Sequence, residues 1–182
     1  MKRRTITGAT IVALTIFFAR VVAAHEPPSE GCAVFSQDLS YELKLMRGTA
    51  VPANAVTGEN RALPRLQLDT YYAVSLAPQE LARFAAKPGQ ASRAASLRGG
   101  AFQFEVPKAG RYRVSISSRH WIDVVDAQTV IDSVAHFGPG CELVHKVVEF
   151  DLPTGRPLTL QLSGHDDAMV GLTITASPRE SR

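Results

Sequence analysis

The chain has 182 residues, 45% of them hydrophobic and 20% charged, with a formal net charge of +3 at pH 7. This length suits one domain with a substantial hydrophobic core. Four of the 20 lysines and arginines lie in the first 20 residues, so the remaining chain has a net charge of about −1 with interspersed signs. That balance excludes nucleic acids and anionic membranes as electrostatic partners, because both need a concentrated basic face.

Residues 1–24 have the pattern of a secretory signal peptide. Lys2-Arg3-Arg4 form a positive start, Ile6 to Phe18 an apolar core, and Val22-Ala23-Ala24 a small-residue cleavage signal. Cleavage would make His25 the first residue and leave no transmembrane domain, so we expect a periplasmic or secreted protein. The alternative is a retained anchor with Arg20 as its flanking charge, but a membrane-spanning helix needs roughly 20 apolar residues.

The two cysteines, Cys32 and Cys141, both lie in the exported part. They follow residues 25–31, which contain Pro27-Pro28 and are predicted to form an extended arm. An oxidising compartment favours a disulfide between the cysteines, and closing a loop of about 110 residues would stabilise the fold by roughly 4–5 kcal/mol. The alternative is a pair of thiolate metal ligands, although neither cysteine belongs to a C-x-x-C pair.

The first part of the mature chain predicts little regular structure. Asp38 can cap a short helix from Leu39 to Met46, in which Leu39, Leu43 and Met46 share one face. Residues 47–64 are predicted as a surface connection and Tyr71 to Leu76 as a strand. The segment from Gln79 to Ala86 is ambiguous between a helix and a strand, with strand slightly favoured, and residues 89–100 are predicted as a loop.

From Ala101 onward the sequence alternates with a period of two. Phe102, Phe104 and Val106 share one face of a strand, and Tyr112, Val114 and Ile116 oppose Arg111, Arg113 and Ser115 on the next, which predicts a hairpin. Four further strands are expected at Trp121 to Asp126, His145 to Leu152, Pro157 to Leu162 and Met169 to Ala176. Residues 32–182 are therefore predicted as one antiparallel β-sandwich, jelly-roll-like, with one short N-terminal helix.

Two resemblances extend this interpretation. The run from Phe102 to Ile116, with Leu158 to Gly164, resembles the accessory β-sandwich domains of secreted enzymes, including pre-peptidase C-terminal and carbohydrate-binding domains, which implies a fold but no ligand. The segments Cys32 to Ser36, Trp121 to Val125 and Cys141 to Pro153 resemble a group of short exported proteobacterial proteins, some labelled homogentisate 1,2-dioxygenase. Such an enzyme holds iron with paired histidines and a glutamate, and this sequence has no closely spaced cluster of that kind.

His25 is the first candidate metal ligand, because an N-terminal histidine offers both an amine and an imidazole to copper. A second histidine would complete a histidine brace like that of lytic polysaccharide monooxygenases and some periplasmic copper carriers. His165, in Ser163-Gly164-His165-Asp166-Asp167, is the preferred partner, with His120, His136 and His145 as competitors. The alternative is that His25 dangles in solvent and that the other histidines make ordinary hydrogen bonds.

Trp121 and Asp123 are the candidate ligand-binding pair, because an exposed tryptophan beside a carboxylate suits a glycan. The alternative, which the sequence favours, is that Trp121 packs against the sheet or the disulfide. Arg111, Arg113 and Arg119 are expected on an outward sheet face rather than in an anion site. Calcium ligands among Asp123, Asp126 and Asp132, or Asp166 and Asp167, are less expected than solvated turns, because no Asp-x-Asp-x-Asp-Gly loop occurs.

The sequence as a whole predicts an exported, disulfide-stabilised β-sandwich that acts as a binding or accessory protein without catalytic activity. No Gly-x-Ser-x-Gly or Ser-x-x-Lys motif is present. The expected partner is a small ligand, a glycan or a cell-envelope protein, and no cofactor is expected. The alternatives are a periplasmic copper-binding protein or copper oxidase that uses His25, with copper as its cofactor, and a dioxygenase-like protein.

Overall fold

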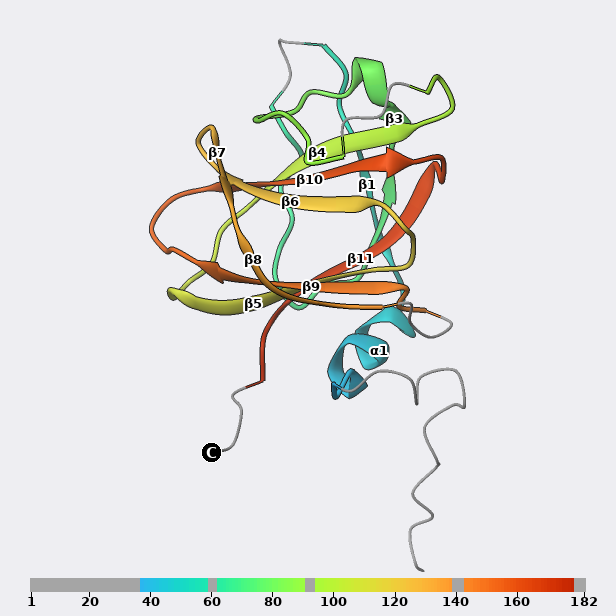
Figure 1. The fold of residues 1–182 in the computed structure, drawn as a ribbon. Coiled ribbons are helices and arrows are strands. Elements are labelled where there is room, and N and C mark those ends of the chain that lie inside the picture. Colours follow the sequence, from blue (N-terminus) through green and yellow to red (C-terminus); the bar gives the residue numbers. More distant parts are fainter. Residues whose placement is uncertain (1–36, 59–61, 91–93, 139–142, 179–182) are drawn as a thin grey trace, which may run out of the picture.

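The computed structural model describes residues 37–58, 62–90, 94–138 and 143–178. Two β-sheets face each other across a common core, as Figure 1 shows. The six-stranded sheet has the order β1 (Val51–Asn54), β2 (Tyr72–Ser75), β11 (Met169–Ala176), β5 (Gly110–Ile116), β9 (Lys146–Leu152) and β8 (Ser133–Phe137). The five-stranded sheet has the order β3 (Ala77–Pro78), β4 (Arg98–Phe104), β10 (Leu158–His165), β6 (Trp121–Asp126) and β7 (Thr129–Ile131). The predicted β-sandwich is confirmed.

The strands pair differently from the predicted hairpin. β4 and β5 follow each other in the chain, but β4 pairs with β10 and β3, whereas β5 pairs with β9 and β11. The turn at residues 107–110 therefore carries the chain from one sheet to the other, and the hairpin prediction is wrong. Alternation shows which face of a strand is apolar, but it does not show which strand lies beside it. The pairing is antiparallel except between β1 and β2, within the described ranges.

The main core lies between the two sheets and is built from the alternating apolar positions. Phe102 and Phe104 of β4 are buried there, as are Val114 of β5 and Phe150 of β9. Burying one such side chain stabilises the fold by about 1.5–3 kcal/mol. The predicted inward faces of these strands are confirmed.

A second, smaller core lies on the outer face of the six-stranded sheet, beneath the helix α1 (Ser40–Met46). Leu39 and Met46 are buried there against Val144 and Val147, with Leu43 partly buried beside them. The predicted apolar face of the helix is confirmed. The N-cap of α1 is Leu39 and has no side-chain capping bond, so the predicted Asp38 cap is wrong by one position. The carboxylate of Asp38 instead accepts the backbone N–H of Ser40 at 2.9 Å, and this bond holds the pKa of Asp38 below its usual value.

Several boundaries differ from the sequence prediction. Residues 47–64 contain the edge strand β1, and Gln79–Leu81 form a short 3₁₀ turn after β3, so the slight preference for a strand from Gln79 is wrong. β7 and β8 lie where no strand is predicted. β4 begins at Arg98, inside the predicted loop, because its glycines permit close packing: a Cβ on Gly100 would lie 2.5 Å from the Cβ of Ala55.

The helix content is small. In the described ranges, no helix has the length and apolar character needed to cross a membrane.

Candidate functional site

The end of β10 carries a local irregularity that redirects His165. β10 pairs regularly with β4 as far as Leu162, and the register then shifts before His165. Gly164 has a φ of +78°, in the left-handed region that glycine adopts without strain. A bulge of this kind commonly changes the direction of the next side chain at the rim of a sheet.

Three oxygen- or nitrogen-bearing groups meet at this turn, which we call the His165 turn (residues 165–167). His165 Nδ1 lies 3.3 Å from Asp166 Oδ1 and 3.2 Å from Asp167 Oδ2. The same nitrogen accepts the backbone N–H of Asp167 at 3.3 Å. Among the described residues, this is the one group of three or more histidines, cysteines or carboxylates whose ligand atoms are close enough for a metal ion.

A second histidine, His120, lies beside His165 with a fully buried side chain. The two rings meet edge to face, with centroids 5.4 Å apart. His120 Nδ1 is 2.8 Å from Ser118 Oγ, but Nε2 has no well-formed hydrogen bond within the described part of the chain. Burial, reinforced by the nearby His165, lowers the pKa of His120 to about 4, although Asp167 and the backbone of His165 act in the opposite direction. His120 is therefore neutral at physiological pH.

His145 lies in the same electrostatic neighbourhood. Burial lowers its pKa, and Arg119, Lys146 and His165 lower it further. The Lys146 ammonium donates to the backbone carbonyl oxygens of Arg119 and His120, at 3.3 and 2.8 Å. Three of the predicted histidine candidates, His120, His145 and His165, thus gather at one end of the sandwich, whereas His136 is exposed on β8.

Trp121 and Asp123, the predicted ligand-binding pair, have different roles in β6. Trp121 is 44% exposed, contrary to the packing that the sequence favours, and its Nε1 donates to Asp123 Oδ1 at 2.8 Å. Asp123 is only 5% exposed, and its other oxygen accepts the backbone N–H of Gly89 at 3.0 Å. The carboxylate therefore holds the indole and the 82–90 segment in place.

The 82–90 segment covers the outer face of the five-stranded sheet and is bound by side chains of that sheet. Gln161 of β10 is fully buried, and its Oε1 accepts the backbone N–H groups of Ala85 and Ala86 at 2.5 and 3.0 Å. Its Nε2 donates to the carbonyl oxygen of Ala86 at 3.3 Å. The segment therefore depends on two buried polar side chains, Gln161 and Asp123.

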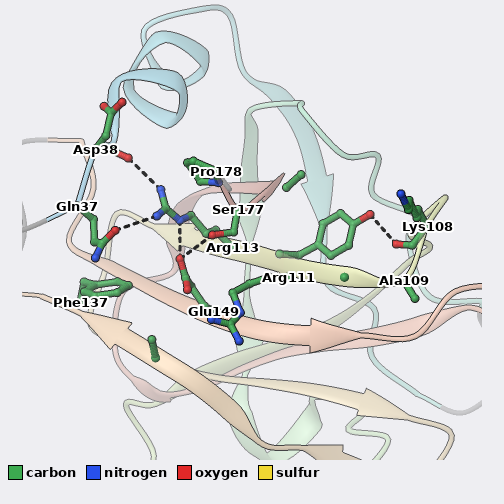
Figure 2. A pocket seen from close by; sticks show the side chains of 14 residues that line it. Gln37, Asp38, Lys108, Ala109, Arg111, Arg113, Phe137, Glu149, Ser177 and Pro178 are labelled. Atoms are coloured by element: carbon green, nitrogen blue, oxygen red, sulfur yellow. Dashed lines mark hydrogen bonds and ion pairs between the residues drawn. The ribbon is translucent and has the colours of Figure 1, made fainter. Parts of the chain in front are cut away.

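A hollow with a volume of about 700 Å³ lies on the outer face of the six-stranded sheet, and we call it the outer hollow (Figure 2). Its walls come from the residues before α1, from β5, β8 and β9, and from the end of β11. It is lined by Gln37, Asp38, Lys108, Ala109, Gly110, Arg111, Tyr112, Arg113, Ala135, Phe137, Glu149, Ala176, Ser177 and Pro178.

The floor of the outer hollow contains a buried ion pair that the sequence does not predict. Arg113, expected on an outward face, is buried, and its Nε donates to Glu149 Oε1 at 2.7 Å. Its other donors reach the carbonyl oxygen of Asp38 at 2.9 Å and Gln37 Oε1 at 3.3 Å (Figure 2). Glu42 of α1 is also buried, 3.7 Å from the guanidinium. The earlier expectation fails because α1 covers the face that alternation marks as polar.

Arg111, two positions away on the same strand, follows the expectation. It is exposed and pairs with Asp151 at 3.1 Å. The buried pair follows from the register of the sheet, in which Arg113 lies directly opposite Glu149. This register is seen only in the structure, so the sequence alone does not predict the pair.

The remaining predicted site residues are either engaged elsewhere or outside the described ranges. His25, Cys32 and Cys141 lie outside the described residues, so neither the disulfide nor the N-terminal copper ligand is tested. Asp126 pairs with Arg156 and does not join Asp123 in a calcium cluster. A pair of histidines with a glutamate, as a dioxygenase iron site would need, does not occur as a close group in the described part.

Comparison with known proteins gives no family for the chain. Neither the protein-family models nor the curated proteins include a match. The function is therefore inferred from the geometry of the His165 turn and of the outer hollow.

Proposed function

We propose that this chain is an exported, non-catalytic binding protein and that it holds a small amphipathic anion in the outer hollow. The main support for this proposal is the hollow itself, which has a volume of about 700 Å³ and contains the buried Arg113–Glu149 pair in its floor. Sites for small molecules are typically concave, of about 300–1,000 Å³, and combine apolar walls with a few fixed polar groups. The outer hollow has both properties.

The lining supports the choice of ligand class. Phe137 and Pro178 provide apolar surface, and Lys108 places positive charge at the rim (Figure 2). Arg111 also lines the rim, where it is paired with Asp151. A carboxylate with an aliphatic or aromatic body would match both parts of this lining. The Tyr112 hydroxyl donates to the carbonyl oxygen of Lys108 at 2.8 Å, which fixes the wall beneath the lysine.

The described neighbours of the two cysteines support the disulfide that this proposal includes. Phe137 and Leu143 flank Cys141 in sequence, and Leu43 follows Cys32; all three belong to the small core under α1. Gln37, also close to Cys32 in sequence, lines the outer hollow together with Phe137. A Cys32–Cys141 bond would join two chain segments whose neighbours already pack together.

The test is a calorimetric screen of small carboxylates against the protein purified from the periplasm. Lys108→Glu should weaken the binding of any carboxylate that is found by about tenfold, because it reverses a charge at the rim. Ala135→Phe should also weaken binding, because it fills the hollow. The matched control is Lys87→Glu, the same charge change at an exposed position beside the other sheet. Equal affinities of all three variants and the parent would contradict the proposal.

A periplasmic copper-binding function is the second candidate, and the cluster of His165 with Asp166 and Asp167 favours it. A copper site of the histidine-brace type requires His25 with a free N-terminus as a further ligand. Adding one residue before His25 should then abolish tight copper binding. Unchanged copper affinity after that extension would exclude the histidine-brace form.

A further inference from the structure

We propose that the His165 turn binds one divalent transition-metal ion through His165 Nδ1 and the carboxylates of Asp166 and Asp167, without any ligand from the N-terminus. This site is separate from the outer hollow. It uses the same turn as the copper alternative but, unlike that alternative, needs no ligand from His25. Its ligand set is contained in three consecutive residues. Zn²⁺ is the appropriate probe, with Cu²⁺ as the comparison.

Ligand atoms from three residues lie close together at the His165 turn. Two carboxylate oxygens lie 3.2 and 3.3 Å from His165 Nδ1. The single lone pair of this nitrogen accepts only a long bond from the Asp167 N–H, at 3.3 Å, which a metal ion would replace. Two carboxylates and an unprotonated nitrogen repel one another, and a metal ion among them would offset that repulsion, as a proton on Nδ1 also would. The side chains of Asp166 and Asp167 are exposed, so an ion can enter and water can complete its coordination.

A buried histidine beside the turn, His120, supports the site independently. His120 is fully buried, and its ring contacts His165 edge to face and interacts with the His165 backbone. Its Nε2 has no well-formed hydrogen bond in the described part of the chain. Buried polar atoms of this kind are rare in proteins, and one beside a cluster of ligand atoms is consistent with a water molecule or an ion bound there. We assign His120 as a positioning residue that holds the His165 ring, rather than as a ligand.

The ligand types select the class of ion. Imidazole nitrogen favours zinc, copper and nickel, and carboxylates complete a mixed nitrogen and oxygen set. Calcium prefers six to eight oxygen ligands, which this turn does not supply. The Lys146 ammonium nearby is bound by two backbone carbonyl oxygens, those of Arg119 and His120.

The experiment is calorimetric titration of the tag-free, chelator-treated exported protein with Zn²⁺, Cu²⁺, Ca²⁺ and Mg²⁺. We expect one equivalent of Zn²⁺ to bind. The double variant Asp166→Asn/Asp167→Asn should bind it at least tenfold more weakly, and His165→Ala should lose it. Asp132→Asn, an exposed aspartate in another loop, is the matched control and should keep the parent affinity. An extension before His25 should have no effect on Zn²⁺.

The role of His120 has its own variants and readout. His120→Phe fills the space and should weaken Zn²⁺ binding by about tenfold, as loss of groups that orient a metal ligand usually does. His120→Gln restores a polar atom and should recover part of the affinity. The imidazole ¹⁵N shift of His165 Nδ1 on Zn²⁺ addition reports ligation directly, and circular dichroism shows which variants are folded.

Three results would overturn the site. These are no Zn²⁺ binding by the folded parent at millimolar concentration, equal affinity in the folded double variant, and loss of Zn²⁺ binding on N-terminal extension alone. The first two remove the His165 turn as a metal site, and the third transfers the site to His25. None of them bears on carboxylate binding in the outer hollow.

Discussion

Arg113 is the residue whose environment differs most from its sequence pattern. It is buried together with two carboxylates, Glu42 and Glu149, beside the small core under α1. Hydroxyl groups complete the network, since Thr175 donates to Glu42 at 2.8 Å and Ser177 to Glu149 at 2.9 Å. A guanidinium that serves two buried carboxylates cannot be replaced without leaving both uncompensated.

We therefore predict that Arg113→Met lowers the free energy of unfolding by about 3–5 kcal/mol, as removal of one partner of a buried ion pair does. Arg111→Met, on the same strand but in an exposed pair with Asp151, should lower it by less than about 1 kcal/mol. Urea denaturation of the two variants beside the parent measures both values. Similar effects of the two substitutions would show that burial does not distinguish these arginines.

Asp38 provides a smaller prediction that depends on pH. Its bond to the Ser40 N–H lowers its pKa, so this bond stabilises the folded state above about pH 4, the usual range for an aspartate. The stabilisation is lost as the pH falls through the lowered pKa. Asp38→Ala should reduce stability by about 0.5–2 kcal/mol at neutral pH. Asp38→Asn keeps an acceptor and should reduce it less, without the loss in acid. Thermal melts from pH 7 to pH 3 compare the three proteins, and identical profiles would contradict a stabilising role for the Asp38–Ser40 bond.

At the scale of elements, the sequence predicts which face of a strand is buried better than it predicts which strands pair. The apolar positions of β4, β5, β10 and β11 point to the core as alternation predicts. The partners of β4 and β5 could not be predicted, because the turn between them crosses from one sheet to the other. The candidate site shows the same division: His165 and its aspartates are adjacent in sequence, whereas the contact with His120 arises only from strand register and the bulge at Gly164.

The 82–90 segment gives the prediction at this scale, because side chains of two strands hold its backbone. Gln161→Leu removes the acceptor of two backbone N–H groups, those of Ala85 and Ala86, and leaves the bond from the Gly89 N–H to Asp123 in place. Amide exchange at Ala85 and Ala86 should become at least tenfold faster, since these bonds shield the amides. The single Trp121 should report the loosening, because Gly89 packs against its indole. Thr159→Ala, at a half-buried position of the same strand, is the control, and unchanged exchange in Gln161→Leu would refute this role.

At the scale of the whole molecule, the two proposed sites lie at opposite ends of shared strands. The outer hollow is lined by the beginning of β5 and the end of β11, whereas His120 follows the end of β5 and the His165 turn precedes β11. Both strands are paired along their lengths within the six-stranded sheet, which makes the body between the sites rigid. We therefore expect metal and carboxylate to bind independently, so the affinity for one should be unchanged in the presence of the other. A shift of more than about threefold would indicate coupling of roughly 0.7 kcal/mol or more.

The proposed Cys32–Cys141 disulfide concerns the molecule as a whole, since it would close a loop of about 110 residues that contains most of the strands. Restriction of the unfolded chain by such a loop amounts to roughly 4–5 kcal/mol in the chain-entropy model. The Cys32→Ser/Cys141→Ser variant should therefore unfold at a clearly lower urea concentration than the parent, and the reduced parent should behave like that variant. Alkylation before and after reduction, read by mass spectrometry, shows directly whether the bond exists. The disulfide is contradicted if both thiols are free without reductant, or if reductant does not change the stability of the parent. The described N-terminal part would then be held by the packing of α1 on the six-stranded sheet.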